Sequence, residues 1–180
     1  DIVKFQTFKA ESLTIKSADK AEYQKKTSGV NESQFEMLKR LELSHNMHYQ
    51  LRDYCELKKI EFLSTAFDAN SLRFLVNDLG LKTLKIPSGE ITNGPLILAH
   101  AKTNCDLIIS TGMATLNEIE AALGVIAFGM LGLNNPSQAS FRAAFSSFEG
   151  QNLLKEKVIL LHCTSEYPAP LKDVNLSAMK

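Results

Sequence analysis

The stretch that decides the fold runs from Leu84 to Leu123 and reads LKIPSGEITNGPLILAHAKTNCDLIISTGMATLNEIEAAL. Two short apolar runs, at 81–86 and 107–109, are each followed by a small polar cluster and then by a helical pattern. The second helical pattern begins with Thr115 and Glu118, which have the spacing of a capping box. Strands and helices that alternate at this spacing predict βα units on a parallel sheet. In such folds the loops that follow the strands hold the chemistry, and both polar clusters fall there.

The overall composition is typical of a globular protein. The chain has 180 residues, of which 44% are hydrophobic and 22% are charged. Lys+Arg and Asp+Glu both number 20, so nothing favours a nucleic acid or an anionic membrane as partner. No apolar run approaches the roughly 18 residues of a membrane span. The three cysteines are odd in number and lack C-x-x-C spacing, which indicates reduced thiols in a cytoplasmic protein.

The residues before the central stretch predict one strand, one long loop and two helices. Apolar and polar residues alternate over 2–8, as in a strand. The segment 9–30 is polar and weakly periodic, so we expect a loop. One helix is expected at 32–43, and Ser44 can cap a second. The expected inward side chains are Phe35, Leu38 and Leu41 in the first helix and Met47, Leu51 and Tyr54 in the second.

Two further strands, at 60–63 and 157–163, complete the pattern. A helix that Gly80 can terminate follows the first of them. The irregular segment 125–156 is expected to extend a helix and to cover the outside of a barrel, and we assign it no further role. The count is five strands in one domain, whereas a closed (β/α)8 barrel usually takes about 250 residues.

Polar residues gather where the expected strands end, and in a parallel barrel these ends face one mouth. Two lysines, several hydroxyls and glycine-adjacent N–H groups suit a small, multiply charged anion such as a phosphate-bearing carboxylate. Glu90 suits proton transfer or stabilisation of a cationic intermediate. The residues are Lys4 and Gln6; Ser64 and Thr65; Lys85, Ser88 and Glu90; Ser110 and Thr111; and Thr164, Ser165 and Tyr167.

Each of these features also has a structural interpretation. A lysine near a strand end is commonly exposed, Ser-Gly-Glu at 88–90 is a common turn, and Ser-Thr-Gly at 110–112 is a common helix cap. His162 falls inside an apolar strand and is expected to be a core histidine. Three histidines in helical patterns are expected to be surface or hydrogen-bonded side chains rather than ligands: His45, His48 and His100. The sequence has no H-E-x-x-H motif, Walker loop or G-x-G-x-x-G motif.

Five blocks of the sequence together resemble the N-acetylneuraminate (sialic acid) synthase family, which includes bacterial legionaminic and pseudaminic acid synthases. They occur in the family's order, near its spacing, and extend over almost the whole chain. The blocks are KFQ at 4–6, STAFD at 64–68, KIPSGE at 85–90, STGM at 110–113 and HCTSEYP at 162–168.

The resemblance implies a (β/α)8 TIM-type barrel, present in residues 1–180 as a partial barrel of about five strands. It implies a transferase of carbohydrate biosynthesis, such as that of capsule or lipopolysaccharide. Phosphoenolpyruvate would condense with an N-acetylated hexosamine aldehyde and phosphate would be released. The aldehyde would be N-acetylmannosamine or a bacterial diacetamido-trideoxy hexose. A divalent metal (Mn²⁺ or Mg²⁺) and a homodimer are implied as well.

The resemblance also implies a role for individual residues. Glu90 and Lys85 would be catalytic. Gln6, Glu90 and Tyr167 would face the sugar. At position 165, where this chain has serine, relatives carry asparagine. The residues that would bind phosphoenolpyruvate are Lys4, Thr65, Lys85, Ser88, Ser110 and Ser165.

Several segments of the family have no counterpart in residues 1–180. They are a first strand, the last strands with both metal-binding histidines, and a C-terminal antifreeze-like domain. We therefore expect that this segment alone does not bind the metal and is inactive. Two alternatives remain open. One is another phosphoenolpyruvate-dependent or aldolase-type barrel, with Lys85 as a Schiff-base nucleophile in an aldolase. The other is a non-catalytic binding module.

Overall fold

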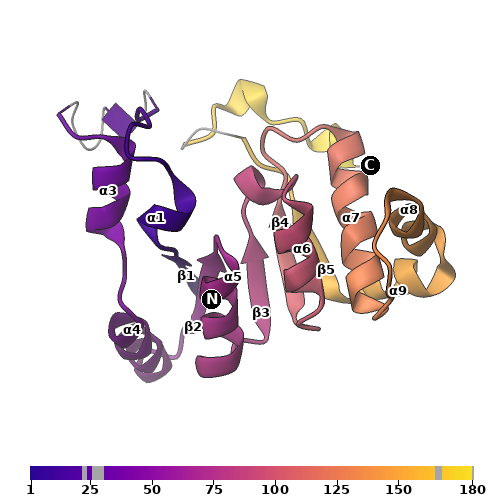
Figure 1. The fold of residues 1–180 in the computed structure, drawn as a ribbon, viewed down its shortest axis with the longest axis horizontal. Coiled ribbons are helices and arrows are strands. Elements are labelled where there is room, and N and C mark those ends of the chain that lie inside the picture. Colours follow the sequence, from indigo (N-terminus) through magenta and orange to yellow (C-terminus); the bar gives the residue numbers. More distant parts are fainter. Residues whose placement is uncertain (22–23, 26–30, 165–167, 180) are drawn as a thin grey trace. The chain divides into compact units, whose positions relative to one another are not determined.

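Strands and helices alternate along the chain, as the sequence predicts (Figure 1). The computed structural model describes residues 1–21, 24–25, 31–164 and 168–179. It divides into two compact units, Asp1–Leu75 and Val76–Lys180. Strand pairing within each unit is parallel, so the predicted α/β class is confirmed. No helix in the described part of the chain is long and apolar enough to cross a membrane.

The first unit contains two paired strands, β1 (Ile2–Thr7) and β2 (Glu61–Ala66). Their register runs from the pair of Ile2 with Glu61 to the pair of Thr7 with Ala66. Helix α4 (His45–Leu57) packs on β2. The predicted cap of α4 is confirmed, since the Ser44 side chain accepts a hydrogen bond from the backbone N–H of Met47.

Helix α4 turns a different face inward from the one that the sequence predicts. Its buried residues are His48 and Cys55, whereas Met47 and Tyr54 of the predicted stripe are exposed. A polar residue occupies the buried position because both ring nitrogens of His48 find hydrogen-bond partners, which removes the cost of burying them. Apolar periodicity cannot reveal such a compensated residue.

The predicted loop at 9–30 contains a short helix, α1 (Ala10–Leu13), and helix α3 (Gln34–Leu41) packs on it. The Glu42 carboxylate accepts a hydrogen bond from Ala10 N–H at 2.7 Å, and this bond holds the first turn of α1. The inward face predicted for α3 is confirmed only in part, because Phe35 and Leu38 are half-buried, whereas Leu41 is exposed and Met37 is the buried residue. A single helical turn covers little of α3, so most of its apolar side chains stay partly exposed. Part of the predicted loop, 22–23 and 26–30, lies outside the described residues.

Strand β2 is longer than predicted and continues through Ser64 and Thr65 to Ala66. Asp68 then caps α5 (Ala69–Arg73), and its side chain accepts a hydrogen bond from Ser71 N–H at 2.8 Å. A π-helical turn, η1 (Phe74–Asp78), follows. Gly80 ends this segment with φ = +71°, the left-handed backbone that favours glycine, so the predicted terminator is confirmed.

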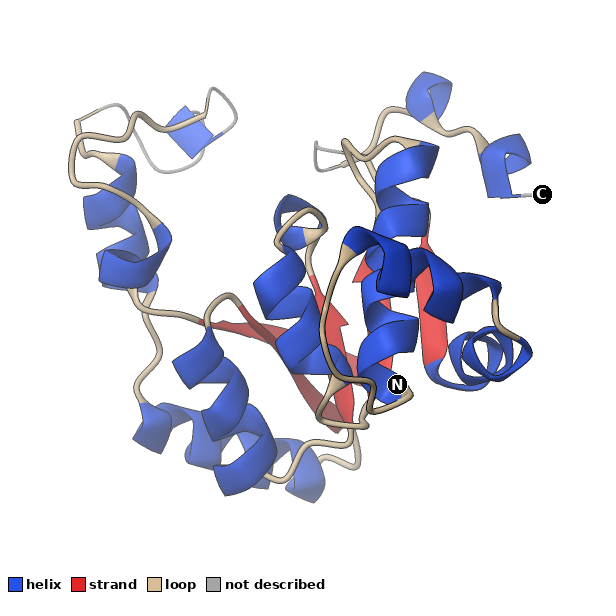
Figure 2. Ribbon diagram, turned by 45° about the vertical axis from the view of Figure 1, so that its right-hand side comes forward, coloured by secondary structure: helices blue, strands red, loops and turns tan. Residues whose placement is uncertain are grey.

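The second unit contains a parallel three-stranded arrangement with helices packed along it (Figure 2). Lys85 pairs with Ile108, and Ile108 pairs in turn with Ile159. The capping box of Thr115 and Glu118 is present as predicted. The strands are β3 (Thr83–Ile86), β4 (Asp106–Ser110) and β5 (Val158–Leu161), and the helices between them begin with α6 (Gly94–Ala101) and α7 (Leu116–Met130).

The segment 125–156 completes α7 and then forms α8 (Gln138–Ser146) and α9 (Phe148–Lys157), which pack on α7. The extension of a helix is therefore confirmed. Helix α9 continues to Lys157, so β5 begins one residue later than the predicted strand at 157–163; at its other end β5 stops at Leu161, before His162. The core-strand interpretation of His162 is wrong. Its Nε2 accepts a hydrogen bond from Asn175 N–H at 3.1 Å. Asn175 lies between two short 3₁₀ turns, η3 (Leu171–Asp173) and η4 (Leu176–Met179), so this bond connects them to the end of β5.

The packing of α6 against α7 predicts a stability effect at Gly129. A Cβ atom at this position would lie 2.5 Å from the Cβ of Ala101, so the helices would have to move apart. Overpacking costs about 1–3 kcal/mol and outweighs the gain in helix propensity of at most about 1 kcal/mol. We expect Gly129→Ala to lower the melting temperature. Gly94→Ala is the control, because a Cβ there meets nothing within 4 Å. Equal melting temperatures of the two variants would contradict the packing described.

Candidate active site

The side chain of Lys85 is buried at the carboxyl end of β3, with 6% of its surface exposed. Its Nζ donates hydrogen bonds to Ser110 Oγ at 2.6 Å and to the Ile86 carbonyl at 2.7 Å. Ser110 Oγ also accepts a hydrogen bond from Cys163 Sγ at 3.3 Å. The parallel register explains this cluster, because Ser110 lies two residues beyond Ile108, the partner of Lys85, and so faces the same side. Burying an ammonium group is costly, which makes Lys85 a strong functional candidate.

Ser88 connects the loops that follow β3 and β4. Its Oγ accepts a hydrogen bond from Gly112 N–H at 3.0 Å, so its own O–H can donate elsewhere. A Cβ at Gly112 would lie 3.0 Å from the Thr164 carbonyl oxygen and 3.1 Å from Ser88 Oγ. Glycine therefore fits this close approach best. The Thr111 hydroxyl, by contrast, donates to the Leu161 carbonyl at 2.9 Å and holds the loop itself.

Glu90 lies in the 3₁₀ turn η2 (Ser88–Glu90), and Asn93 orients its carboxylate. The Asn93 Nδ2 donates to Glu90 Oε2 at 2.8 Å, while Asn93 Oδ1 accepts from Leu96 N–H at 3.3 Å and caps α6. One amide therefore fixes both the helix start and the carboxylate. The sequence analysis missed Asn93, although Asn-Gly-Pro at 93–95 is a clear helix-start signal.

In the first unit, Lys4 and Gln6 lie exposed on one face of β1. Thr65 is the register partner of Gln6 and so shares that face. Thr65 is 1% exposed, and among the described residues its hydroxyl has no hydrogen-bond partner. A buried hydroxyl without a partner is rare, and a bound water or ligand is one explanation for it.

Ser64 does not belong with these residues. It alternates with Thr65 along β2, and its hydroxyl lies 2.7 Å from the hydroxyl of Thr7 on the opposite face. The prediction that Ser64 faces the mouth is therefore wrong. Ser165 and Tyr167 lie outside the described residues, and their placement stays a prediction.

Within the described ranges, no three His, Cys, Asp or Glu side chains come together as a metal site. His48 cannot serve as a ligand where it is, since both of its ring nitrogens are engaged inside the first unit. The described residues do not fit the divalent metal that the family resemblance implies, and we derive no step through it.

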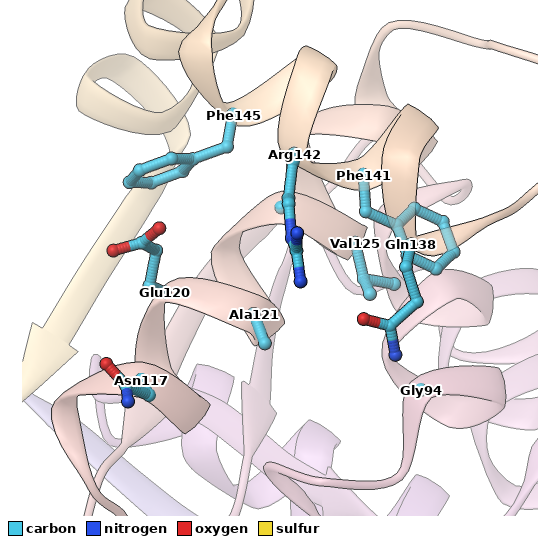
Figure 3. Close-up of a pocket in the computed structure, with 10 residues that line it drawn as sticks. Gly94, Asn117, Glu120, Ala121, Val125, Gln138, Phe141, Arg142 and Phe145 are labelled. Carbon is cyan, nitrogen blue, oxygen red and sulfur yellow. The ribbon is translucent and has the colours of Figure 1, made fainter.

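A cavity of about 510 Å³ lies on the outer side of α7, where α8 crosses it (Figure 3). Arg142 reaches from α8 toward Ala121 of α7, and the ring of Phe145 lies near Glu120. None of the strand-end candidates lines this cavity, so it is separate from the candidate site. The lining residues are Gly94, Asn117, Glu120, Ala121, Gly124, Val125, Gln138, Phe141, Arg142 and Phe145.

The second unit is thus a parallel α/β fold that carries a buried lysine, donor hydroxyls and an oriented carboxylate at its strand ends. These features define a parallel α/β protein with a cluster of polar and charged side chains at its strand ends. The chain belongs to the NeuB family, whose model matches residues 1–180.

Similar proteins support this assignment. N,N'-diacetyllegionaminic acid synthase of Legionella pneumophila is 46% identical over 180 residues, which are 100% of this chain and 45% of that protein. The synthase of the same name from Campylobacter jejuni is 44% identical over 100% of this chain and 47% of its own length.

A solved structure matches the fold. It is an N-acetylneuraminic acid synthetase of Leptospira borgpetersenii in complex with citrate, with a TM-score of 0.68 and 27% identity. The match covers 98% of this chain and 48% of that one. The predicted fold, part of a TIM-type barrel, is thereby confirmed. The chain spans about half the length of the curated relatives it matches.

Two buried histidines predict how stability depends on pH. Burial lowers the pKa of both His48 and His100, and among the described residues His100 Nε2 has no hydrogen-bond partner. The unfolded chain therefore binds protons more readily than the folded one. Stability should be complete above the unfolded value of about 6.5 and fall as the pH drops below it.

We expect His100→Gln to reduce the loss of melting temperature between pH 7 and pH 5. A second substitution, His48→Gln, should reduce it further, since both groups act in the same direction. If the melting temperature of the double variant fell between pH 7 and pH 5 as much as that of the parent, other groups would control the acid sensitivity.

Proposed function

We propose that the full-length protein condenses phosphoenolpyruvate with an N-acetylated hexosamine aldehyde and releases phosphate. Membership of the NeuB family and two legionaminic acid synthases at 46% and 44% identity support this function. Both relatives are named for an acid that carries two N-acetyl groups. This favours a diacetamido-trideoxy hexose over N-acetylmannosamine as the substrate.

The observation that carries the proposal is the cluster around Lys85. A buried ammonium group, held by Ser110 and close to the loop of Ser88, is complementary to a phosphate or carboxylate. Phosphoenolpyruvate has both groups on three carbons. We assign Lys85, Ser88 and Ser110 to its binding.

The family resemblance gives the same role to three residues outside this cluster, namely Lys4, Thr65 and Ser165. The unpartnered hydroxyl of Thr65 supports its assignment. Gln6, Glu90 and Tyr167 are proposed to face the sugar.

The proposed chemistry forms one carbon–carbon bond to the aldehyde and one carbon–oxygen bond to water, and it breaks the carbon–oxygen bond to phosphate, so that the added oxygen becomes a carbonyl. The methylene carbon of phosphoenolpyruvate attacks the aldehyde carbon, and the aldehyde oxygen takes up a proton. Positive charge develops at the carbon that bears the phosphate, and water adds there with loss of a proton. The tetrahedral intermediate then expels inorganic phosphate. The Glu90 carboxylate, oriented by Asn93, stabilises this charge or accepts the proton of the water, while Lys85 holds an anionic end of the substrate.

Three further features belong to the same proposal: a divalent metal (Mn²⁺ or Mg²⁺), a homodimer and a cytoplasmic location. The residues described form no metal site, so the donors for the metal would have to lie elsewhere in the assembly.

Phosphate release by the full-length protein tests the proposed function. The assay supplies phosphoenolpyruvate with either N-acetylmannosamine or a diacetamido-trideoxy hexose, and we expect faster release with the second sugar. Borohydride trapping with pyruvate separates this reaction from a Schiff-base aldolase, because only the aldolase would be covalently labelled at Lys85. Labelling at Lys85 without phosphate release would overturn the proposal.

Removal of the Glu90 charge should impair the chemistry more than binding. We expect Glu90→Gln to lower kcat by about 100-fold or more while phosphoenolpyruvate still binds. Glu120→Gln is the matched control, because Glu120 lines the separate cavity on α7. Near-parental turnover in the Glu90 variant would remove this residue from the mechanism.

An anion bound at Lys85 should stabilise the folded protein. At a concentration about 100 times its Kd, a ligand adds about 2.7 kcal/mol to the unfolding free energy. We expect phosphoenolpyruvate to raise the melting temperature of the parent and of Lys82→Met, in which an exposed lysine is replaced. Lys85→Met should lose the shift. A full shift in Lys85→Met would place the anion elsewhere.

A further inference from the structure

Three buried polar side chains form a hydrogen-bonded chain between α4 and the paired strands of the first unit. Thr7 Oγ1 lies 2.8 Å from His48 Nε2 and 2.7 Å from Ser64 Oγ. His48 Nδ1 lies 2.8 Å from the Ser44 carbonyl oxygen. His48 and Ser64 are 0% exposed and Thr7 is 4% exposed. Fully buried positions normally hold apolar side chains, so a buried polar network of this kind calls for a structural or functional explanation.

The direction of every hydrogen bond in this network follows from its last acceptor. The Ser44 carbonyl can only accept, so Nδ1 of His48 carries the proton. In the neutral ring Nε2 is then a pure acceptor and takes the hydrogen of the Thr7 hydroxyl. Thr7 Oγ1, having used its own hydrogen, accepts from the Ser64 hydroxyl. The chain therefore runs in one direction, from Ser64 through Thr7 and His48 to Ser44.

Aromatic packing holds the His48 ring in the orientation that this chain requires. The ring meets Phe62 edge-on at a centroid distance of 6.5 Å and Phe74 edge-on at 5.4 Å. Phe62 in turn stacks on Phe5 at 5.2 Å. The imidazole is thus fixed both by its neighbours and by its two hydrogen bonds.

The network lies next to two candidate site residues along the paired strands β1 and β2. Gln6 and Thr65 are register partners, and each is adjacent in sequence to a member of the network, Thr7 or Ser64. The Thr7 carbonyl also accepts a hydrogen bond from Phe67 N–H at 3.3 Å. A two-residue slip of β1 would keep its inside–outside pattern but would leave buried hydroxyls and Nε2 without partners. The polar chain opposes a slip that apolar packing alone would tolerate.

We infer that His48 is a positioning residue, which fixes the register of β1 on β2 through Thr7 and Ser64 and thereby places Gln6 beside Thr65. The catalytic consequence rests on the function proposed above, because Gln6 and Thr65 are assigned there to the sugar and to phosphoenolpyruvate. His48 itself faces away from those side chains and acts through the strands.

Paired variants of the full-length protein test this role. Thr7→Val keeps the shape of the side chain but removes the hydroxyl, and Thr7→Ser keeps the hydroxyl. We expect Thr7→Val to lower kcat/KM about tenfold, chiefly by raising KM, whereas Thr7→Ser stays within about twofold of the parent. His48→Phe keeps a ring without nitrogens and should resemble Thr7→Val. If His48→Phe does not fold, the two threonine variants decide. Gln50→Ala, at an exposed position of the same helix, is the control and should have parental KM values.

A spectroscopic readout tests the chain independently of activity. In a long-range ¹H–¹⁵N spectrum of the histidine side chains, His48 should be the Nδ1–H tautomer. In Thr7→Val the Nε2 resonance should shift, because its hydrogen-bond donor is gone. A protonated Nε2 in the parent would overturn the inferred chain, and parental KM values in Thr7→Val would overturn the positioning role. If the parent releases no phosphate, the proposed function fails and the catalytic consequence fails with it. The spectrum still decides the tautomer and the chain.

Discussion

Parallel pairing is the constraint on which the candidate site of the second unit depends. Parallel strands end at the same edge, so one register brings together side chains that are far apart in sequence. Lys85, Ser110 and Cys163 are separated by 25 and 53 residues, yet they form one hydrogen-bonded cluster. Once Lys85 is paired with Ile108, the position of Ser110 follows from the alternation of side chains along β4.

Buried polar groups are used differently in the two units. In the first unit His48 has partners at both nitrogens and is part of the β1–β2 packing. In the second unit His100 donates to the Leu96 carbonyl, and its other nitrogen has no partner among the described residues. The first arrangement specifies a register, whereas the second leaves a desolvation cost that is not offset. The contrast shows that burial of a histidine does not by itself indicate a site.

The sequence predicts the features that depend on local chemistry. The capping box of Thr115 and Glu118, the Gly80 terminator and the alternation of strands and helices follow from neighbouring residues, and all are present. The features that depend on tertiary partners were missed. The inward face of α4 differs because His48 is satisfied by Thr7, 41 residues away, and α1 forms because Glu42 holds its first turn. Predicting the side to which Ser64 points would need the true length of β2, and the apolar pattern underestimates this length. Asn-Gly-Pro at 93–95 marks the start of α6 from local sequence alone, whereas the contact of Asn93 with Glu90 depends on the turn η2.

The central claim is that the strand ends of the second unit hold phosphoenolpyruvate through Lys85. A crystal structure of the full-length protein with phosphoenolpyruvate tests it most directly. We expect a phosphate or carboxylate oxygen within hydrogen-bond distance of Lys85 Nζ, with the Ser88 hydroxyl donating to the same ligand. Phosphoenolpyruvate bound elsewhere, for example beside Arg142 in the cavity between α7 and α8, with no ligand oxygen near Lys85 Nζ, would contradict it.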